Sequence, residues 1–510
     1  MKNLLYLLAT ATFLVGVQGV SAQEINNKTL TEWSWQKLPT AMAELDETLR
    51  IPNNALNPLD VVNTINWTSK AFEKRGFTVE SLATDGPPLL LAERKAKKAK
   101  TTILFYLHLD GQAVDSSKWF QESPYIPVIK KLVEGKWQPV GDQELAHGYQ
   151  DEWRIFSRSS SDDTGPVVMF LSAIDLIDAH KINPNYNIKM IMDMEEEDGS
   201  PHLPAAVTKY AQKLKADQLV IFDGPRHISN KPTLSFGARG IATITLKVFG
   251  PRVPLHSGHY GNYAPNPALQ LSQLLASMKD THGRVLIKGY YDGIQLTDED
   301  RQEMAMVPDN ESDIQHKLGI AETDKVGSNY QEALQYPSLN IRGLSSGWVG
   351  NESRTIVPAT ATAEIDIRLV PESDGPRLIE LVRQHIINQG FYIIKGTTPT
   401  EEERAKYGKM IYFSSIYSYP AFRTPINSTI GNWLSTSLHN AFGEDPIKIR
   451  IMGGSIPISP FVKTLNTPAV VVPVVNPDNN QHSPNENLRI GNFREGIMAF
   501  TAILATPLKE

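Results

Sequence analysis

One largely apolar segment that ends in a run of acidic residues restricts the fold of this chain more than any other feature. Residues 188–194 have the composition of a buried strand, and they lead into Glu195, Glu196, Glu197 and Asp198, followed by glycine and serine. A strand of this kind delivers carboxylates to the rim of an open α/β sheet, where ligands bind. Neighbouring carboxylates repel one another, and a bound cation offsets that cost. An isolated acidic run is more often a surface turn, so the interpretation depends on the rest of the chain.

Four further segments place metal-type ligands near the end of a strand or at the start of a helix. The candidate ligands of the five segments are His108, Asp162, Glu197, Asp223 and His482. Imidazole and carboxylate groups suit zinc, and also cobalt or manganese. The chain has no cysteine, so only histidine, aspartate and glutamate side chains could hold a metal. Five such segments in one α/β domain predict a shared metal site.

The charge of this cluster favours two metal ions over one. Asp162, Glu197 and Asp223 together carry three negative charges, whereas two divalent ions carry four positive charges. A bound hydroxide, the nucleophile of a two-metal hydrolase, balances the remaining positive charge. A single ion leaves the cluster anionic, which makes it a poorer activator of water.

The order of predicted elements divides the chain into three parts. Strands and helices alternate through residues 23–236, which predicts an α/β catalytic domain with a mixed sheet flanked by helices. Residues 237–400 follow the order β-α-β-β-α-β, with 391–395 as the last strand, which describes a ferredoxin-like α+β unit. Buried-strand patterns return in residues 401–510, so the ferredoxin-like unit is expected to be inserted within the α/β domain. A polar stretch between residues 280 and 336 has no assigned role.

The N-terminus has the features of a secretory signal peptide. Lys2 precedes an apolar stretch at residues 4–17, and Val20-Ser21-Ala22 offers small residues for cleavage after Ala22. A membrane anchor is the alternative, but the apolar stretch is short for a span, and no later stretch reaches that length. We therefore expect residues 1–22 to be removed, and the mature protein to be periplasmic or secreted with no stable membrane span. The net charge of −6 gives no reason to expect a nucleic-acid partner.

Eight motifs of the chain resemble those of the M20 family of co-catalytic zinc metallopeptidases, which includes carnosinase-like dipeptidases, glutamate carboxypeptidases and aminoacylases. They follow the family order and extend over nearly all of the mature chain. The motifs are His108-Leu109-Asp110, residues 161–165, residues 196–200, Asp223-Gly224, residues 255–258, residues 366–371, residues 453–457 and residues 482–486. Any one motif is weakly specific, whereas the combination is highly specific.

The resemblance implies a role for each metal ligand. Asp162 would bridge two divalent ions, most simply Zn²⁺. His108 and Asp223 would complete one metal site, and Glu197 and His482 would complete the other.

The resemblance also implies a base and a residue that orients a ligand. Glu196 would be the general base that takes a proton from the attacking water and delivers it to the leaving amine. Asp110 would orient His108. The peptide bond between Asp162 and Asp163 is predicted to be cis, as it often is in the family.

Substrate contacts are assigned by the resemblance to the inserted unit and to a glycine-rich turn. His256 would reach the active site, commonly from the other subunit of a homodimer, and stabilise the oxyanion. Arg368 and the turn Gly453-Gly454-Ser455 would hold a substrate carboxylate. From the residues alone, Arg368 could instead pair with Asp366 or Glu364 at the surface, and the glycines could form only a tight turn.

Three hypotheses about function follow. The first is an exported di-zinc peptidase that cleaves short peptides, most simply dipeptides, and acts as a homodimer through the inserted unit. The second keeps the two-metal machinery but acts as a carboxypeptidase or an N-acyl-amino-acid amidohydrolase. The third is a zinc-binding or peptide-binding envelope protein without catalysis, which the retention of Glu196 and all five ligands argues against. The chain departs from the family pattern at Ser159, Thr164 and Gly111-Gln112, which affects substrate preference rather than catalysis.

Overall fold

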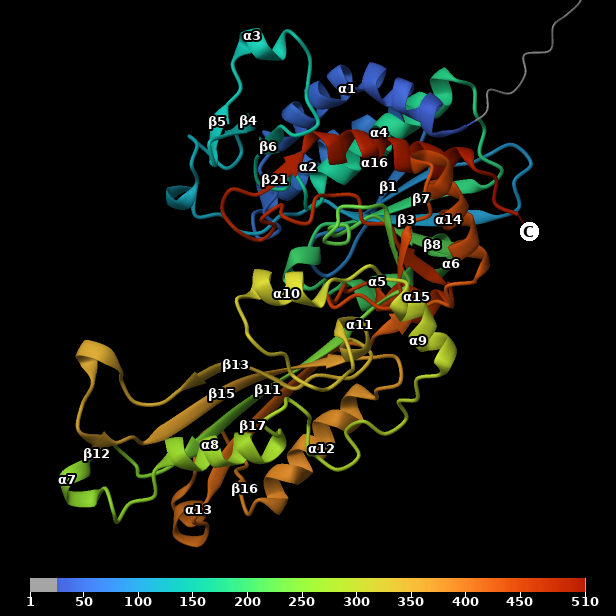
Figure 1. The fold of residues 1–510 in the computed structure, drawn as a ribbon. Coiled ribbons are helices and arrows are strands. Elements are labelled where there is room, and N and C mark those ends of the chain that lie inside the picture. The colour runs from blue at the N-terminus through green and yellow to red at the C-terminus, as the bar shows by residue number, and fades with distance from the viewer. Residues whose placement is uncertain (1–24, 510) are drawn as a thin grey trace, which may run out of the picture.

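The computed structural model of the protein describes residues 25–509 (Figure 1). The signal peptide predicted over residues 1–22 lies outside the described residues. Within residues 25–509, no helix combines the length and the apolar character that crossing a bilayer requires.

An eight-stranded mixed sheet forms the centre of the catalytic domain. Its strands are, in spatial order, β1 (Thr78–Leu82), β2 (Leu89–Arg94), β7 (Asn187–Asp193), β3 (Thr102–His108), β8 (Gln218–Ile221), β20 (Ala469–Val471), β9 (Thr233–Ser235) and β19 (Ile447–Ile449). The four central strands β7, β3, β8 and β20 run parallel to one another. Strands β1 and β2 extend the sheet in antiparallel fashion.

Helices cover both faces of this sheet. The larger layer contains α1 (Asn27–Leu49), α2 (Pro58–Glu73), α4 (Thr164–Ala179), α14 (Thr429–Phe442) and α16 (Ile490–Ala505). The smaller layer contains α5 (Leu203–Lys209), α6 (Ala211–Leu214) and α15 (Ser459–Leu465). In β3, Phe105 packs into the larger layer, while Leu104 and Tyr106 pack into the smaller one. Because alternate side chains are buried on both faces, the central strands are continuous apolar runs. The predicted α/β fold is confirmed.

A smaller antiparallel sheet lies at the edge of the catalytic domain. It contains β21 (Asn487–Arg489), β6 (Arg154–Phe156), β4 (Val128–Val133) and β5 (Lys136–Pro139), in that spatial order. The connection between β5 and β6 includes the short helix α3 (Asp142–Leu145). The sequence did not predict this sheet, because its strands are short and β21 lies far along the chain from the other three.

The inserted unit is a five-stranded sheet with helices on one face (Figure 1). Its strands are β13 (Asn340–Ser345), β15 (Thr360–Leu369), β11 (Gly240–Phe249), β17 (Met410–Tyr419) and β16 (Tyr392–Ile393), and its covering helices are α8 (Pro267–Met278) and α12 (Gly375–Asn388). Alternate residues of β11, from Ala242 to Val248, face these helices. A ferredoxin-like unit inserted in the α/β domain is therefore confirmed.

The fourth strand of the ferredoxin-like unit, and with it the domain boundary, differs from the prediction. Segment 391–395 contributes only the short edge strand β16, whereas β17 pairs with β11 along its whole length. The unit therefore continues beyond residue 400, and the chain returns at β18 (Phe422–Arg423), which pairs with β10 (Gly237–Ala238). The pattern of β17 was missed because only its first two residues, Met410 and Ile411, are buried.

The polar stretch between residues 280 and 336 connects the two domains. It forms α9 (Asp298–Ala305), α10 (Glu311–Leu318) and α11 (Tyr330–Ala333). Asp309 lies 2.9 Å from Nε2 of His227, and Asp300 lies 2.7 Å from Nη2 of Arg450, both in the catalytic domain. These partly buried ion pairs fix the inserted unit against the catalytic domain.

The far end of the inserted unit carries short elements only. They are β12 (Leu255–His256), α7 (Ser257–Tyr260) and β14 (Ile356–Val357), with α13 (Glu401–Lys406) beside β16. Figure 1 shows β12 and α7 at the tip of the unit, away from the catalytic domain.

Candidate metal centre

The predicted ligands meet at one rim of the eight-stranded sheet. His108 is the last residue of β3, Asp223 follows β8, and Glu197 lies in the short 3-10 turn Glu196–Asp198 that follows β7. Asp162 lies two residues before the start of α4, and His482 lies in the loop between β20 and β21. Because the central strands are parallel neighbours, their carboxyl ends lie together, which brings these side chains into contact.

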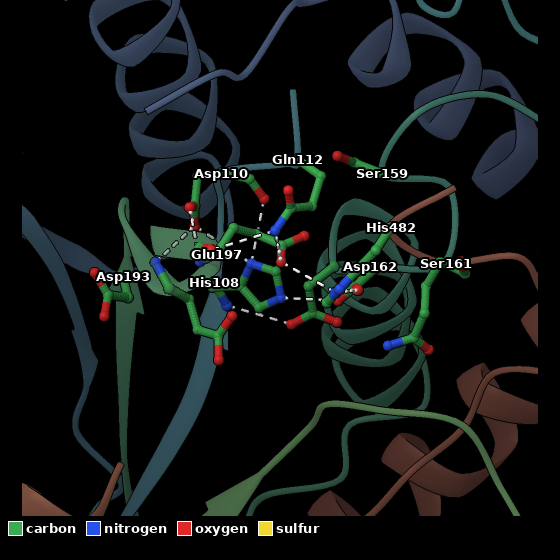
Figure 2. A network of polar contacts seen from close by, with 12 residues as sticks. His108, Asp110, Gln112, Ser159, Ser161, Asp162, Asp193, Glu197 and His482 are labelled. Atoms are coloured by element: carbon green, nitrogen blue, oxygen red, sulfur yellow. Dashed lines mark hydrogen bonds and ion pairs between the residues drawn. The ribbon is translucent and has the colours of Figure 1, made fainter. Parts of the chain in front are cut away.

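Asp162 is shared by two groups of ligands. The first group is His108, Asp162 and Asp223, and the second is Asp162, Glu197 and His482. Within each group, one ligand atom from each residue lies within 4.8 Å of the others. Figure 2 shows the imidazoles of His108 and His482 directed at the Asp162 carboxylate, each with Nε2 at 3.0 Å from a different oxygen. Nε2 of His482 also lies 3.1 Å from Oε2 of Glu197.

The ionisable groups of the cluster shift one another strongly. Hydrogen bonds with Asp162 and Glu197 raise the pKa of His482 to about 10. Burial lowers the pKa of His108, but its hydrogen bonds with Asp110 and Asp162 outweigh burial and raise the pKa well above its ordinary value. Burial, together with the charge of Asp162, raises the pKa of Asp223 to about 6. The cluster therefore holds excess negative charge that attracts protons, and a divalent cation would satisfy the same charge.

Asp110 fixes three groups of the cluster at once. Its two carboxylate oxygens accept the backbone N–H groups of Glu196 and Glu197, each at 3.1 Å. Its Oδ1 lies 3.4 Å from Nδ1 of His108, and its carbonyl oxygen lies 3.2 Å from the same nitrogen. The contact with His108 is the one that the sequence predicted. The contacts with the 3-10 turn were not predicted, because they depend on how β3 and β7 lie side by side.

Glu196 lies in the same turn as Glu197 but belongs to neither ligand group. Burial raises the pKa of its carboxyl well above the ordinary value, and the charges of Asp223 and Asp162 raise it further, against the effect of His108. A carboxylate with a raised pKa is suited to accept a proton near neutral pH.

Glu486 is a buried residue of the motif 482–486, to which the sequence assigned no role. Its Oε1 accepts hydrogen bonds from Ser161 Oγ and from the backbone N–H groups of Ser161 and Asp162, and its Oε2 accepts from Arg158 Nη1 and Ser159 N, all at 2.8–3.1 Å. Ser159 has a φ of 60°, a conformation that favours glycine. Glu486 thus holds the loop that carries Asp162. The peptide bond between Asp162 and Asp163 is cis, as predicted.

Gln112, at one of the positions where the chain departs from the family pattern, contacts a predicted ligand. Its Nε2 donates to Oε2 of Glu197 at 3.1 Å and to the carbonyl oxygen of Glu197 at 3.2 Å (Figure 2). The amide leaves Glu197 with a fixed orientation toward His482.

The predicted substrate residues meet at the junction of the two domains. Arg368 Nη1 donates to Ser455 Oγ at 2.7 Å, while its Nε lies 3.8 Å from Asp366. The backbone N–H of Arg239 donates to the carbonyl oxygen of Gly454, which ties the turn 453–455 to the base of the inserted unit. The surface pairing of Arg368 with Glu364 does not form, since Glu364 contacts Thr245 and Arg342 instead.

Two further residues of this junction were not singled out in the sequence. Arg239 is 7% exposed and donates to the carbonyl oxygens of Tyr336 and Arg368. Tyr419, at the end of β17, is close enough to Glu196 and Arg368 for both charges to act on its hydroxyl. Burial raises the pKa of Tyr419, and Glu196 raises it further, so the hydroxyl stays protonated. Neither residue carries a motif, so only the folded chain identifies them.

His256 does not join the cluster within one chain. It lies in β12 at the tip of the inserted unit, where its side chain is exposed and its Nδ1 accepts from Gly258 N. The structure therefore separates His256 from the other predicted site residues.

The donor set fits two divalent cations. Each ligand group supplies one imidazole and two carboxylates, with Asp162 common to both. Neutral imidazole and carboxylate are ligands for zinc and for related transition metals. Hydrogen bonds with Asp110 and Gln112 orient the ligands His108 and Glu197, a support that metal sites commonly have.

Comparisons with known proteins agree with this geometry. A family model described as a peptidase dimerisation domain, of the M20 family, matches residues 236–391. A Beta-Ala-His dipeptidase from Mus musculus is 27% identical over 432 residues, which cover 83% of this chain and 80% of that protein. A Cys-Gly metallodipeptidase from Candida albicans is 27% identical over 475 residues, which cover 88% of this chain and 89% of that protein.

A solved structure shows the same fold over nearly the whole chain. The M20 family metallo-carboxypeptidase Sso-CP2 from Sulfolobus solfataricus superposes with a TM-score of 0.75 and 28% identity, covering 91% of this chain and 98% of that one. The inserted domain, the relatives and the fold all point to one family. The chain is similar to the M20 family of metallopeptidases in its inserted domain, in its relatives and in its fold.

Proposed function

We propose that this protein is a dinuclear metallopeptidase that hydrolyses dipeptides. The observation that carries the proposal is the sharing of Asp162 between two ligand groups at the rim of the sheet. Relatives named as Beta-Ala-His dipeptidase and Cys-Gly metallodipeptidase support the choice of substrate class.

The five ligands would hold two zinc ions. His108 and Asp223 would bind one ion, Glu197 and His482 the other, and Asp162 both. Bound divalent ions would polarise the scissile carbonyl and lower the pKa of the attacking water. Metal analysis of the purified protein tests this assignment, and we expect about two equivalents of zinc per chain, from the charge count of the ligands.

Glu196 acts as the general base. Its carboxylate accepts a proton as the water oxygen bonds to the carbonyl carbon, and it returns that proton to the amine nitrogen as the C–N bond breaks. Asp110 positions this base, because it accepts the backbone N–H of Glu196. Burial raises the pKa of the Glu196 carboxyl, which makes its carboxylate a stronger proton acceptor.

Arg368 and Ser455 would bind the C-terminal carboxylate of the substrate. A guanidinium is suited to bidentate recognition of a carboxylate, and Ser455 is already hydrogen-bonded to it. A carboxylate bound there, at the base of the inserted unit, limits how much substrate fits between it and the metals. This arrangement suits short peptides.

The protein would act as a homodimer. The match of residues 236–391 to a peptidase dimerisation domain supports this assembly, as does the exposed edge strand β13. His256 would then reach the active site of the other subunit and stabilise the oxyanion, since it lies far from the cluster in its own chain. The signal-like N-terminus supports export to the periplasm or the medium, which cell fractionation with N-terminal sequencing of the mature protein would test.

Amino-acid release from free and N-acetylated dipeptides, each with and without a chelator, tests the substrate class. Chelator-sensitive release from free dipeptides is the expected result. Release confined to acetylated substrates would contradict dipeptidase activity. It would favour a carboxypeptidase or an acylase, the first of which is supported by the likeness to the metallo-carboxypeptidase.

A further inference from the structure

A cavity of about 520 Å³ lies on one face of the small sheet, apart from the metal centre. Strands β4, β5 and β6 supply one wall, and the loop between β20 and β21 supplies the other. In Figure 1 this small sheet lies at the edge of the catalytic domain, away from the inserted sheet.

Cations and aromatic rings alternate along the strand wall. Lys130 Nζ lies 4.5 Å from the centre of the Phe156 ring, the Phe156 and Trp137 ring centres are 5.2 Å apart, and the Arg154 guanidinium lies 4.9 Å from the Trp137 ring. The register places these side chains together, because Lys130 pairs with Arg154 and Leu132 pairs with Trp137 across the sheet. The alternation of cations and aromatic rings along this wall therefore results from the pairing of the strands.

The positive charge of the cavity is not balanced. Among the described residues that line it, Asp478 is the only acid, and its Oδ2 lies 2.7 Å from Arg154 Nη2. Lys130 and Lys136 have no carboxylate partner within residues 25–509. Three cations and one carboxylate leave the lining with an excess of two positive charges.

Lys130 is the unusual member of this group. It is 4% exposed, and its Nζ donates to a single acceptor, the carbonyl oxygen of Phe120, at 3.2 Å. Burial lowers the pKa of its ammonium group, because the charged form is poorly solvated. A buried ammonium is normally paired, so an anionic partner is missing from the chain itself.

We propose that this cavity binds a small anion that carries a flat apolar ring. The carboxylate or phosphate of the ligand would contact Lys130, with Lys136 among the lining residues adding positive charge, and its ring would pack against Trp137 and Phe156. Asparagine side chains at 480 and 485 would offer further hydrogen bonds.

The position of the cavity gives this site a way to affect the metal centre. Asn480 and Asn485 belong to the loop that carries His482, and Asn485 Oδ1 accepts from Phe120 N at 2.9 Å. A ligand in the cavity would contact this loop through Asn480 and Asn485. Binding itself does not depend on peptidase activity, and it should persist in the Glu196→Gln protein.

Calorimetric titration of the full-length protein with phenyl phosphate, benzoate and inorganic phosphate tests the proposal. We expect saturable binding of at least one ring-bearing probe, tighter than inorganic phosphate. Comparison of phenyl phosphate with benzoate distinguishes a phosphate ligand from a carboxylate ligand. Lys130→Met should weaken the binding at least about tenfold, as the loss of a charged hydrogen-bond donor predicts.

The neighbouring lysine provides a matched control. Lys131 points to the other face of β4 and pairs with Glu144, so Lys131→Met should leave the affinity unchanged. Lys136→Gln, at an exposed position, should weaken binding without any risk to folding. Binding that survives both Lys130→Met and Lys136→Gln would belong to the metal centre or to Arg368 and would overturn the proposal, as would the absence of saturable binding for every probe.

Discussion

The two large sheets of this protein bury their side chains differently. The eight-stranded sheet is covered on both faces, and its central strands are almost entirely buried. The five-stranded sheet is covered on one face by α8 and α12, and its edge strand β13 is largely exposed. Full burial fixes the ends of the strands, so the first sheet can position metal ligands within hydrogen-bonding distance of one another. The second sheet leaves surface available for another subunit.

The contrast extends to the functional side chains of the two sheets. His108 and Asp110 are fully buried, and each makes several hydrogen bonds. His256 is exposed at the tip of the inserted unit. The buried group is complete within one chain, whereas we propose that His256 acts in the active site of a second subunit. The following substitutions test this division.

Substitution of the shared ligand should have the largest effect. Asp162→Asn removes one negative charge from both ligand groups, so both metal ions should be lost or weakly held. We expect peptidase activity to fall by more than about 10⁴-fold, since the rate enhancement depends on the metals. Metal analysis and dipeptide hydrolysis, measured on the same sample, check this result. Normal metal content in this variant would show that Asp162 does not bridge.

Substitution of the base should leave the cluster intact. Glu196→Gln preserves the size of the side chain but removes its ability to accept a proton, so kcat should fall about 10²–10⁴-fold. Metal content should match that of the unaltered protein, because Glu196 is in neither ligand group. Asp198→Asn, in the same turn, is the control. Near-normal kcat in the Glu196→Gln protein would remove Glu196 from the role of base.

The exposed histidine tests the dependence on a second subunit. His256→Ala should lower kcat about 10²–10³-fold if it removes an oxyanion donor, while His259→Ala should have little effect. Hybrid dimers of His256→Ala and Glu196→Gln chains contain one site with both residues intact, so mixing should restore activity. If subunit exchange is demonstrated and no activity returns, His256 acts within its own chain or not at all.

Glu486 tests how much of the metal site depends on buried support. Glu486→Gln directs an amide NH₂ at backbone N–H groups that now donate to a carboxylate, so the loop of Asp162 must shift. We expect metal affinity to fall about 10–100-fold, as for other residues that orient metal ligands, and excess zinc should restore much of the activity. Competition with a chelator measures the affinity. A loss of activity that zinc does not relieve would indicate general unfolding.

The smallest effect on the folded chain is expected at the edge of the inserted sheet. Leu344 is 58% exposed on β13, so Leu344→Lys should change the free energy of unfolding by no more than about 0.5 kcal/mol. The same change should convert dimers to monomers, which light scattering detects. Leu318→Lys, at an exposed position of α10, is the matched control. Dimers that persist in the Leu344→Lys protein would place the subunit contact elsewhere.

Much of the fold was readable from local patterns. The apolar runs at 101–107 and 188–194 predicted strands, and the ligands that follow them predicted a site at the rim of the sheet. The end of the inserted unit could not be found in this way. Strand β17 buries only two residues and is recognisable only through its pairing with β11. The signal peptide, the metals and the residue roles remain predictions.

The sequence by itself determined the chemistry of the site, because ligand type and strand-end position are both local properties. It identified the five metal-type ligands and the neighbouring Glu196. Because the chain has no cysteine, it also excluded thiolate ligands. Only the tertiary structure decided which groups support them. Glu486 reaches Asp162, Gln112 reaches Glu197, and Lys130 aligns with Arg154 through contacts between distant segments. Such contacts depend on strand register and loop packing, which a single sequence does not record.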